Sequence, residues 1–430
     1  MLKSIRKIQK QFTHLNKLNS RRAGPHLIHK TPLELNTRLS KKYGVNVFFK
    51  REDLQPIRSF KIRGAAAMIS SLSRKEKKQG VVCASAGNHA QGVAQVCACL
   101  EIPVDVFVPE ITPMQKIQRI ESLVAHNSHG HLHRSGKSLA NTLESAVKFS
   151  IEQNKSFIHP FDNDNIIFGQ GTVAEEIYNQ LQEHGKTPNT ILSSIGGGGL
   201  ISGISLYSSV QEGNCRIVGI EPETCPSMTV ALQQGVPTEV PCFDDFVDGA
   251  SVSKVGEKTF DICRRMIDPK EVHTVEVGHL CTVILEMYQE DGIIVEPAGA
   301  LSVAGLDILS EKHMLAKNQN IVCVISGGNN DVARYPEIIE RSLQWKQLKH
   351  YFFIEFGQTP GELLRWVKTV LGPTDDITRF EYIKKSDKEK GTVLVGVQVK
   401  RKEDFIGIEQ RMVLGNFSYQ KLDEVDLVVL

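Results

Sequence analysis

The chain has 430 residues, of which 41% are hydrophobic and 23% charged, and its formal net charge is +2. This length supports roughly two or three domains, each with its own core, and so small a net charge gives no indication of a nucleic-acid partner. No run of about 18 apolar residues occurs, so we expect no membrane-spanning helix.

The chain begins with a basic segment. Its first acidic residue is Glu34. An acid-poor start of this kind fits either a targeting peptide or a polar helix packed on a domain surface. Because serine and alanine are scarce here, we favour the helix and a cytoplasmic protein. The basic residues concerned are Lys3, Arg6, Lys7, Lys10, Lys17, Arg21 and Arg22.

Short apolar runs alternate with helical patterns between residues 45 and 330. Runs that are apolar throughout are typical of parallel strands covered by helices on both faces. We therefore predict an α/β, doubly wound architecture. The predicted strands cover residues 45–50, 80–85, 103–109, 190–196, 215–222 and 321–328, and the predicted helices cover 62–78, 87–101, 200–211 and 298–313.

Nine cysteines are scattered through the chain, and several lie inside apolar runs such as VVCAS and IVCVIS. A thiol in such a run behaves as a small core residue. No CxxC pair is present, so we expect neither a disulfide framework nor a zinc site. We expect the protein to lie in a reducing compartment.

Lys61 lies where the first predicted strand passes into a helix, within IRSFKIRGA. Burial and the helix dipole both disfavour an ammonium there, so the pKa of Lys61 should fall and its amine become nucleophilic. The alternative is an ordinary lysine on a solvated helix. The segments that follow favour the first interpretation.

The strand VVCA runs into a loop of small polar residues, and a helix starts there. Such a loop directs backbone N–H groups and short polar side chains toward an anion such as an α-carboxylate. Asn88 could also donate to a phenolic oxygen on a cofactor ring. The alternative is a plain capped helix start, with Ser85 or Asn88 as N-cap. The loop is Ser85, Ala86, Gly87, Asn88 and His89.

Four consecutive glycines follow the strand ILSSI and precede another helix. They cost backbone entropy and add nothing to a core, but they let the backbone wrap closely around a phosphate. No Gly-Lys-Ser/Thr follows, which excludes a nucleoside-triphosphate loop. Glu221 stands where a dinucleotide-binding acid would be, yet Ser202 breaks the required glycine spacing. We predict a monophosphate site at Gly196, Gly197, Gly198, Gly199 and Leu200.

Ser326 ends the last buried strand, just before two glycines. It could bond to a heterocyclic nitrogen or be a simple turn residue. All four segments lie at the carboxyl ends of predicted strands, where open α/β sheets bind their ligands. We therefore predict that they form one site.

The pattern changes after Trp345. Strands at 349–356, 377–385, 391–400 and 423–430 and helices at 362–372 and 402–415 give the order βαββαβ of a ferredoxin-like domain. No catalytic constellation falls within it. We predict a catalytic domain at 1–345, made of two α/β subdomains, and a small sensor domain at 346–430.

These motifs resemble the fold-type II pyridoxal-phosphate enzymes and, among them, the threonine dehydratases. IRSFKIRGA, SAGNHAQGVA, SIGGGGLISG, FVDGASV, EPAGALS and VISGGNND all match that branch, and the tail resembles its ACT-like regulatory domain. The resemblance implies a Schiff base on Lys61 and a bond from Asn88 to the ring 3-oxygen. It also implies phosphate binding at residues 196–200, a contact from Ser326 to the pyridine nitrogen and substrate binding at residues 85–89.

The resemblance further implies conversion of L-threonine to 2-oxobutanoate and ammonia, the first step of isoleucine biosynthesis. Lys61 would act as general base. Isoleucine or valine would be the effector at the C-terminal domain, and the assembly would be a homotetramer or homodimer. Glu296 in EPAG would line the site, although an acid at a helix start often only compensates the dipole.

One segment departs from the family pattern: residues 126–133 contain four histidines in eight positions. Their spacing matches no zinc pattern, so we predict a solvated edge strand and loop and no metal. The rival functions are a serine lyase or racemase on the same fold, a nicotinamide-dependent dehydrogenase, and a non-enzymatic amino-acid sensor.

Overall fold

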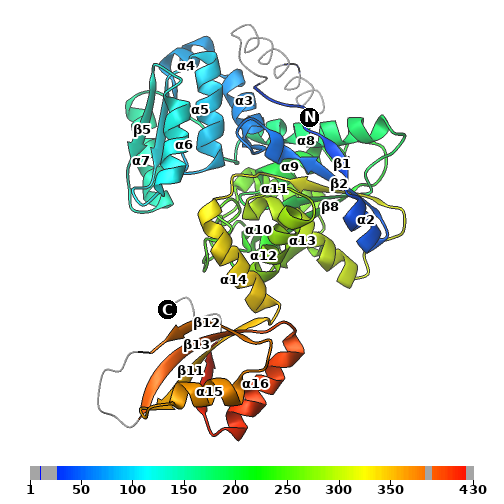
Figure 1. Ribbon diagram of the computed structural model, residues 1–430. Coiled ribbons are helices and arrows are strands. Elements are labelled where there is room, and N and C mark those ends of the chain that lie inside the picture. Colours follow the sequence, from blue (N-terminus) through cyan, green and yellow to red (C-terminus); the bar gives the residue numbers. More distant parts are fainter. Residues whose placement is uncertain (1–9, 11–26, 383–389, 423–430) are drawn as a thin grey trace. The chain divides into compact units, whose positions relative to one another are not determined.

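The structure is a computed structural model that describes residues 10, 27–382 and 390–422 (Figure 1). The chain separates into two compact units, Met1–Asp331 and Val332–Leu430. The domain boundary predicted at residue 345 stays a prediction. Apart from Lys10, the basic residues of the N-terminal segment lie outside the described residues, so its two interpretations remain open.

The first unit contains a large sheet with the strand order β1-β2-β10-β7-β8-β9. Strand β1 is antiparallel to β2, and the other neighbours run parallel, as the continuous apolar runs predict. The strands are β1 (Leu33–Leu35), β2 (Asn46–Arg51), β7 (Thr190–Ser194), β8 (Arg216–Pro222), β9 (Val272–Val275) and β10 (Asn320–Ile325).

A smaller sheet has the order β5-β4-β3-β6, and all its strands are parallel. Helices α4 to α7 gather around it in Figure 1. The strands are β3 (Val81–Ala84), β4 (Val104–Val108), β5 (Gly130–Arg134) and β6 (Ser156–Phe157), and the helices are α4 (Arg74–Gln79), α5 (Asn88–Leu100), α6 (Met114–Val124) and α7 (Leu139–Glu152).

Helices cover the large sheet, and the apolar patterns predict some of these helices. None of the helices in the described residues is long and apolar enough to cross a membrane. One predicted helix, 62–78, is two helices, because Ser73 caps α4 with a capping box to Glu76 and ends the first segment. The helices are α2 (Thr37–Tyr43), α3 (Lys61–Ser71), α8 (Asp164–Gln182), α9 (Gly199–Ser208), α10 (Ser227–Gln234), α11 (Glu257–Met266), α12 (Val277–Gln289) and α13 (Pro297–Glu311).

A buried ionic network fixes the start of α3. The guanidinium of Arg63, fully buried, donates to Glu52 at 2.7 and 2.8 Å and to Glu176 of α8 at 2.8 Å. Lys50 of β2 is also fully buried and donates to Glu176 at 2.6 Å. Buried charges are tolerated only when they are paired in this way. The network therefore ties β2 and α8 to the first turn of α3.

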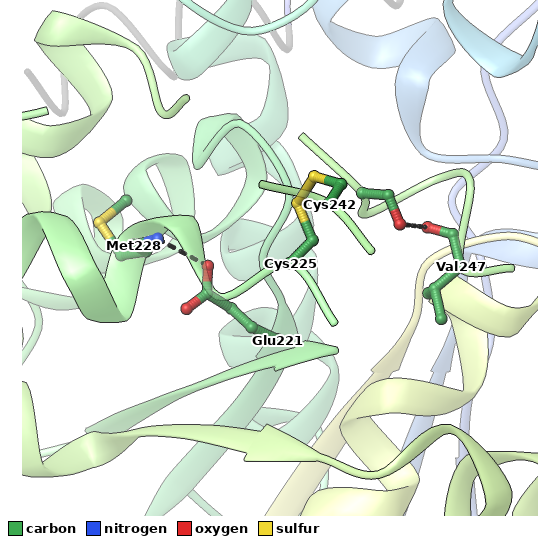
Figure 2. The surroundings of a disulfide bond; sticks show 6 residues. Glu221, Cys225, Met228, Cys242 and Val247 are labelled. Atoms are coloured by element: carbon green, nitrogen blue, oxygen red, sulfur yellow. Dashed lines mark hydrogen bonds between the residues drawn. A yellow bond between two sulfur atoms is a disulfide. The ribbon is translucent and has the colours of Figure 1, made fainter. Parts of the chain in front are cut away.

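One cysteine prediction is wrong. Cys225, just after β8, forms a disulfide with Cys242, across 17 positions of sequence (Figure 2). Neither cysteine belongs to a strand-like apolar run, and their spacing matches no disulfide signature. The remaining cysteines are free, and most of them are buried, as a core role predicts.

The histidine-rich segment forms β5, an edge strand, as predicted. His133 contacts Asp105 at 2.8 Å and stacks on Phe107 with ring centroids 4.5 Å apart. Within the described residues, no group of three or more histidine, cysteine or acidic side chains is placed to hold a metal ion.

The second unit has helix α14 followed by the order β11-α15-β12-β13-α16-β14 and an antiparallel sheet ordered β12-β13-β11-β14. This is the predicted ferredoxin-like arrangement. Its last strand precedes the segment predicted as a strand, 423–430, which lies outside the described residues. The elements are α14 (Tyr335–Trp345), β11 (Lys349–Gly357), α15 (Glu362–Val370), β12 (Asp376–Glu381), β13 (Lys390–Gln398), α16 (Lys402–Leu414) and β14 (Ser418–Leu422).

Candidate active site

Lys61 is the first residue of α3, and its side chain is only partly exposed. Its Nζ donates to the carbonyl of Pro160 at 3.1 Å and lies 5.4 Å from the centre of the Phe60 ring. Burial lowers the pKa of Lys61 to about 8, an effect that Glu296 opposes. The interpretation of Lys61 as a solvated surface lysine is therefore wrong, and the lowered pKa increases the fraction of its amine that is unprotonated and nucleophilic.

The 85–89 loop joins β3 to α5. The N-cap residue is Gly87, no side chain caps the helix, and the Ser85 hydroxyl accepts from the Gly87 N–H at 3.1 Å. The alternative of a plain N-cap at Ser85 or Asn88 is therefore wrong. His89 is buried, with Nε2 2.9 Å from the carbonyl of Ile158, and burial lowers its pKa to about 3. A helix start with free N–H groups and a neutral histidine suits a carboxylate.

Asn88 is held on both sides of its amide. Its Nδ2 donates to both carboxylate oxygens of Glu296, at 2.8 and 2.9 Å. Its Oδ1 accepts from Nδ2 of Asn329 at 2.7 Å, and Asn329 also donates to the carbonyl of Ile57 at 2.8 Å. These bonds fix the Asn88 amide beside the loop that leads to Lys61.

The glycine loop (residues 196–199) lies between β7 and α9. Gly198 has φ of 89°, which only glycine adopts without strain. A Cβ on Gly197 would lie 2.3 Å from the Phe161 ring. The hydroxyl of Thr259 donates to the Gly197 carbonyl at 2.7 Å, which fixes the direction of that peptide. The loop therefore has room for backbone alone, as a phosphate cradle requires.

Leu200 and Gly196 extend this cradle in different ways. The Leu200 side chain is buried in the hydrophobic core, so only its backbone can face a ligand. A Cβ on Gly196 would lie 3.1 Å from the Cα of Ala250. The FVDGASV segment therefore packs directly against the glycine loop.

Ser326 follows β10 and is buried. Its carbonyl accepts from the N–H of Phe60 at 3.1 Å, which places it beside the segment that holds Lys61. Its hydroxyl donates to the carbonyl of Ala298 at 3.2 Å. The oxygen can accept from a protonated nitrogen in this orientation, or the hydroxyl can rotate to donate to an unprotonated one.

Glu296 is the N-cap residue of α13, but its side chain makes no cap hydrogen bond. Its carboxylate turns instead to Asn88, and a Cβ on Gly327 would lie 2.3 Å from its Oε1. Burial raises the pKa of Glu296 to about 7. Dipole compensation, the simpler interpretation of this acid, does not describe where the side chain lies.

The sequence-based prediction missed three residues at this site. Pro160 supplies the carbonyl that Lys61 contacts, Phe161 lies against the glycine loop, and Asn329 orients Asn88. The first two follow the two-residue strand β6, which no apolar run reveals. Asn329 stands inside VISGGNND, where its polarity just after a buried strand was the available signal.

The contacts of Glu221 argue against a dinucleotide-binding site. Its carboxylate accepts from the N–H of Met228 at 2.7 Å (Figure 2). It also accepts from the N–H and the hydroxyl of Thr229, at 2.8 and 2.7 Å. It therefore caps α10 and is not available to a ribose. Burial raises the pKa of Glu221 to about 7.

A surface pocket of about 280 Å³ lies elsewhere, next to β1 and the end of α12. Its arginines are neutralised within it: Arg38 pairs with Asp291 at 2.5 Å, and Arg51 pairs with Glu34 at 2.9 Å. This pocket contains none of the predicted site residues, and we do not assign it to the chemistry.

Comparisons with known proteins agree with this arrangement. Residues 25–327 match the family model for pyridoxal-phosphate dependent enzymes, and residues 340–429 match the C-terminal regulatory domain of threonine dehydratase. The chain therefore belongs to the pyridoxal-phosphate-dependent enzymes, and pyridoxal phosphate is its cofactor. The glycine loop, with no room for side chains, and the partly buried Lys61 fit that cofactor.

The relatives narrow the family. The chain is 43% identical to "L-threonine dehydratase biosynthetic IlvA" of Halalkalibacterium halodurans, over 92% of each chain, and 45% identical to the protein of the same name from Lactococcus lactis, over 90% of this chain and 91% of the relative. It belongs with these biosynthetic threonine dehydratases.

Solved structures agree. The processed form of threonine deaminase isoform 2 from Solanum lycopersicum matches with a TM-score of 0.70 and 34% identity, over 79% of this chain and 93% of that one. Serine racemase from Dictyostelium discoideum matches with a TM-score of 0.67 and 27% identity, over 77% and 99%. The predicted fold class, family and cofactor are confirmed.

Proposed function

We propose that the chain converts L-threonine to 2-oxobutanoate and ammonia, as the first step of isoleucine biosynthesis. The observation that carries the proposal is the position of Lys61. Lys61 follows β2 and the glycine loop follows β7, so both lie at the carboxyl end of the large sheet. Burial lowers the pKa of the Lys61 amine to about 8. The 43–45% identity to proteins named L-threonine dehydratase supports the choice of substrate.

In this proposal Lys61 holds pyridoxal phosphate through Nζ, and the glycine loop with the Leu200 backbone holds its phosphate. Asn88 would hold the ring oxygen through Nδ2, the same atom that donates to Glu296, and Ser326 would contact the ring nitrogen. When bound, the cofactor withdraws electrons from the substrate Cα.

The residues of the chain then perform the remaining tasks. The N–H groups of the 85–89 loop bind the substrate carboxylate and orient the Cα–H bond. The amine of Lys61 removes the Cα proton, and its lowered pKa keeps much of it unprotonated near pH 8. His89 stays neutral and adds no charge next to the substrate.

Borohydride reduction followed by peptide mass mapping tests the cofactor attachment. We expect the label on Lys61 and none on Lys50, which is a matched internal control because it is a buried lysine engaged by Glu176. A label elsewhere, or none, would contradict the proposal. For the substrate, 2-oxobutanoate release from threonine should exceed pyruvate release from serine. The reverse order would favour a serine lyase or racemase.

The second unit is proposed to bind isoleucine or valine as effector. Its support is the match to the regulatory domain. Isoleucine binding should be measured on the borohydride-reduced full chain, whose active site is blocked. Binding that persists supports a separate effector site, whereas binding abolished by reduction places isoleucine in the active site.

We further propose a cytoplasmic homotetramer or homodimer. The free, mostly buried thiols support a reducing compartment, although the single disulfide is unusual there. Light scattering of the purified chain gives its mass directly, and a monomer would refute the assembly. Cell fractionation tests the compartment.

A further inference from the structure

Glu296 is a buried acid whose structural role is not evident from its place in the chain. It starts α13 yet does not cap it. Its oxygens instead receive the amide of Asn88, a residue of the loop proposed to bind the substrate. The Cα atoms of Gly249 and Gly327 border it, because a Cβ on them would lie 3.6 and 2.3 Å from its Oε1.

Three charged groups interact electrostatically with Glu296. Lys61 of α3 is one of them. Asp248 raises the pKa of Glu296 and Lys116 lowers it, and these two side chains form an ion pair with each other. Lys61 is therefore the one uncompensated charge among these neighbours. With burial, the pKa of Glu296 rises to about 7, so a substantial fraction of it carries a proton at neutral pH.

We infer that Glu296 is the acid that protonates the leaving β-hydroxyl of the substrate, an assignment that rests on the proposed function. Lys61 removes the Cα proton, and that electron pair forms the Cα–Cβ double bond as the Cβ–O bond breaks. The hydroxyl leaves as water with the proton of Glu296. Proton transfer from the Lys61 ammonium to the Glu296 carboxylate then restores both groups, and no oxidant or reductant is required.

A leaving group that needs no proton tests this assignment directly. Chloride leaves 3-chloro-L-alanine as an anion, whereas hydroxide is a poor leaving group unless it is protonated. For Glu296→Gln we expect threonine turnover to fall about 10²- to 10⁴-fold, the usual contribution of a general acid, and chloroalanine elimination to stay within about threefold. Glu296→Asp, which keeps a carboxyl, should retain part of the threonine activity.

Glu221→Gln is the matched control, because Glu221 is also a buried glutamate with a pKa raised to about 7. It caps α10 and does not contact Asn88, so its loss should affect both substrates alike. If Glu296→Gln also lowers both rates equally, the proton-donor role is wrong and Glu296 is structural.

Two readouts are independent of turnover. Glu296→Gln should still exchange the Cα hydrogen of threonine with deuterium, because Lys61 is intact. At pH 6 both Glu221 and Glu296 should contribute to the infrared absorption of protonated carboxyls. The difference spectrum of the unaltered chain minus Glu296→Gln should therefore contain one protonated-carboxyl band, which Glu221→Gln retains. Loss of exchange, or no change in the band, would overturn the assignment. Should the unaltered chain act on neither substrate and take no borohydride label, the proposed function itself fails.

Discussion

Gly197 is the position where the structure predicts cofactor affinity most directly. In Gly197→Ala the new Cβ would lie 2.3 to 2.5 Å from three atoms of the Phe161 ring. Real Cβ atoms do not approach carbon so closely, so either the ring or the glycine loop must move. Phe161 also packs edge-on against His159, with ring centroids 4.7 Å apart, which restricts its retreat.

Overpacking of this kind costs about 1–3 kcal/mol. The cofactor-free chain can relieve it by letting the loop move away, but phosphate binding requires the loop in place. The cost therefore appears in binding, and since about 1.4 kcal/mol corresponds to tenfold, the Kd for pyridoxal phosphate should rise about 5- to 150-fold. Titration of the cofactor-free protein, followed by cofactor absorbance, measures this Kd.

Two further variants identify the cause. Phe161→Ala in the Gly197→Ala background removes the clashing ring and should restore most of the affinity. Gly305→Ala is the matched control: its Cβ would lie 2.6 Å from Ile220 in the core, away from the loop. It should lower the free energy of unfolding and leave the Kd unchanged. Normal cofactor binding by Gly197→Ala, or no rescue by Phe161→Ala, would refute the steric argument.

Three stability predictions follow from buried groups. In the cofactor-free chain, Lys61→Met should raise the free energy of unfolding by up to about 3 kcal/mol below pH 8. The pKa of Lys61 is lowered from 10.5 to about 8, so the unfolded chain binds more protons than the folded chain between these pH values. The gain in the free energy of unfolding should therefore vanish as the pH rises to 10.5. A gain that is independent of pH in urea titrations would contradict this prediction. Arg63→Met leaves the buried Glu52 without its cation and Glu176 with Lys50 alone, and it should cost roughly 3–5 kcal/mol. The exposed Arg264→Met should cost about 0–1 kcal/mol in the same assay. Replacing Cys225 and Cys242 by serine should cost roughly 2–4 kcal/mol for a cross-link over 17 positions, and a reductant should lower the unaltered chain to the same level.

Much of the fold can be predicted from the sequence, because fully buried parallel strands have continuously apolar sequences. Strands β3, β4, β7 and β8 lie within predicted runs, and β2 and β10 each extend one residue beyond theirs. The missed elements include long helices, among them α8 and α12, as well as elements that are short or follow other rules. Strand β6 has two residues, and the break between α3 and α4 depends on the capping box of Ser73 and not on hydrophobic period. The disulfide joins two loops whose proximity only the tertiary structure determines.

The candidate site could be predicted to a similar extent. Lys61, the 85–89 loop, the glycine loop and Ser326 follow predicted strands, and the structure brings them to one end of the sheets. Pro160 and Phe161 could not be predicted, because a backbone carbonyl and an aromatic ring carry no chemical signature of their own. Asn329 acts through Asn88, so its role depends on a contact between residues far apart in the sequence.

Glu221 and Glu296 show why the tertiary structure is needed to assign a chemical role to a buried acid. Both are buried glutamates near strand ends, and burial raises the pKa of each to about 7. Glu221 receives two backbone N–H groups and a hydroxyl of α10, and these contacts account for its burial. Glu296 instead accepts from the side-chain amide of Asn88 and from the backbone N–H of Asn329. Both partners of Glu296 belong to segments of the candidate active site, and on this basis we infer that Glu296 is the proton donor. Chemistry at this site therefore follows from the partners of each acid and not from residue type or titration.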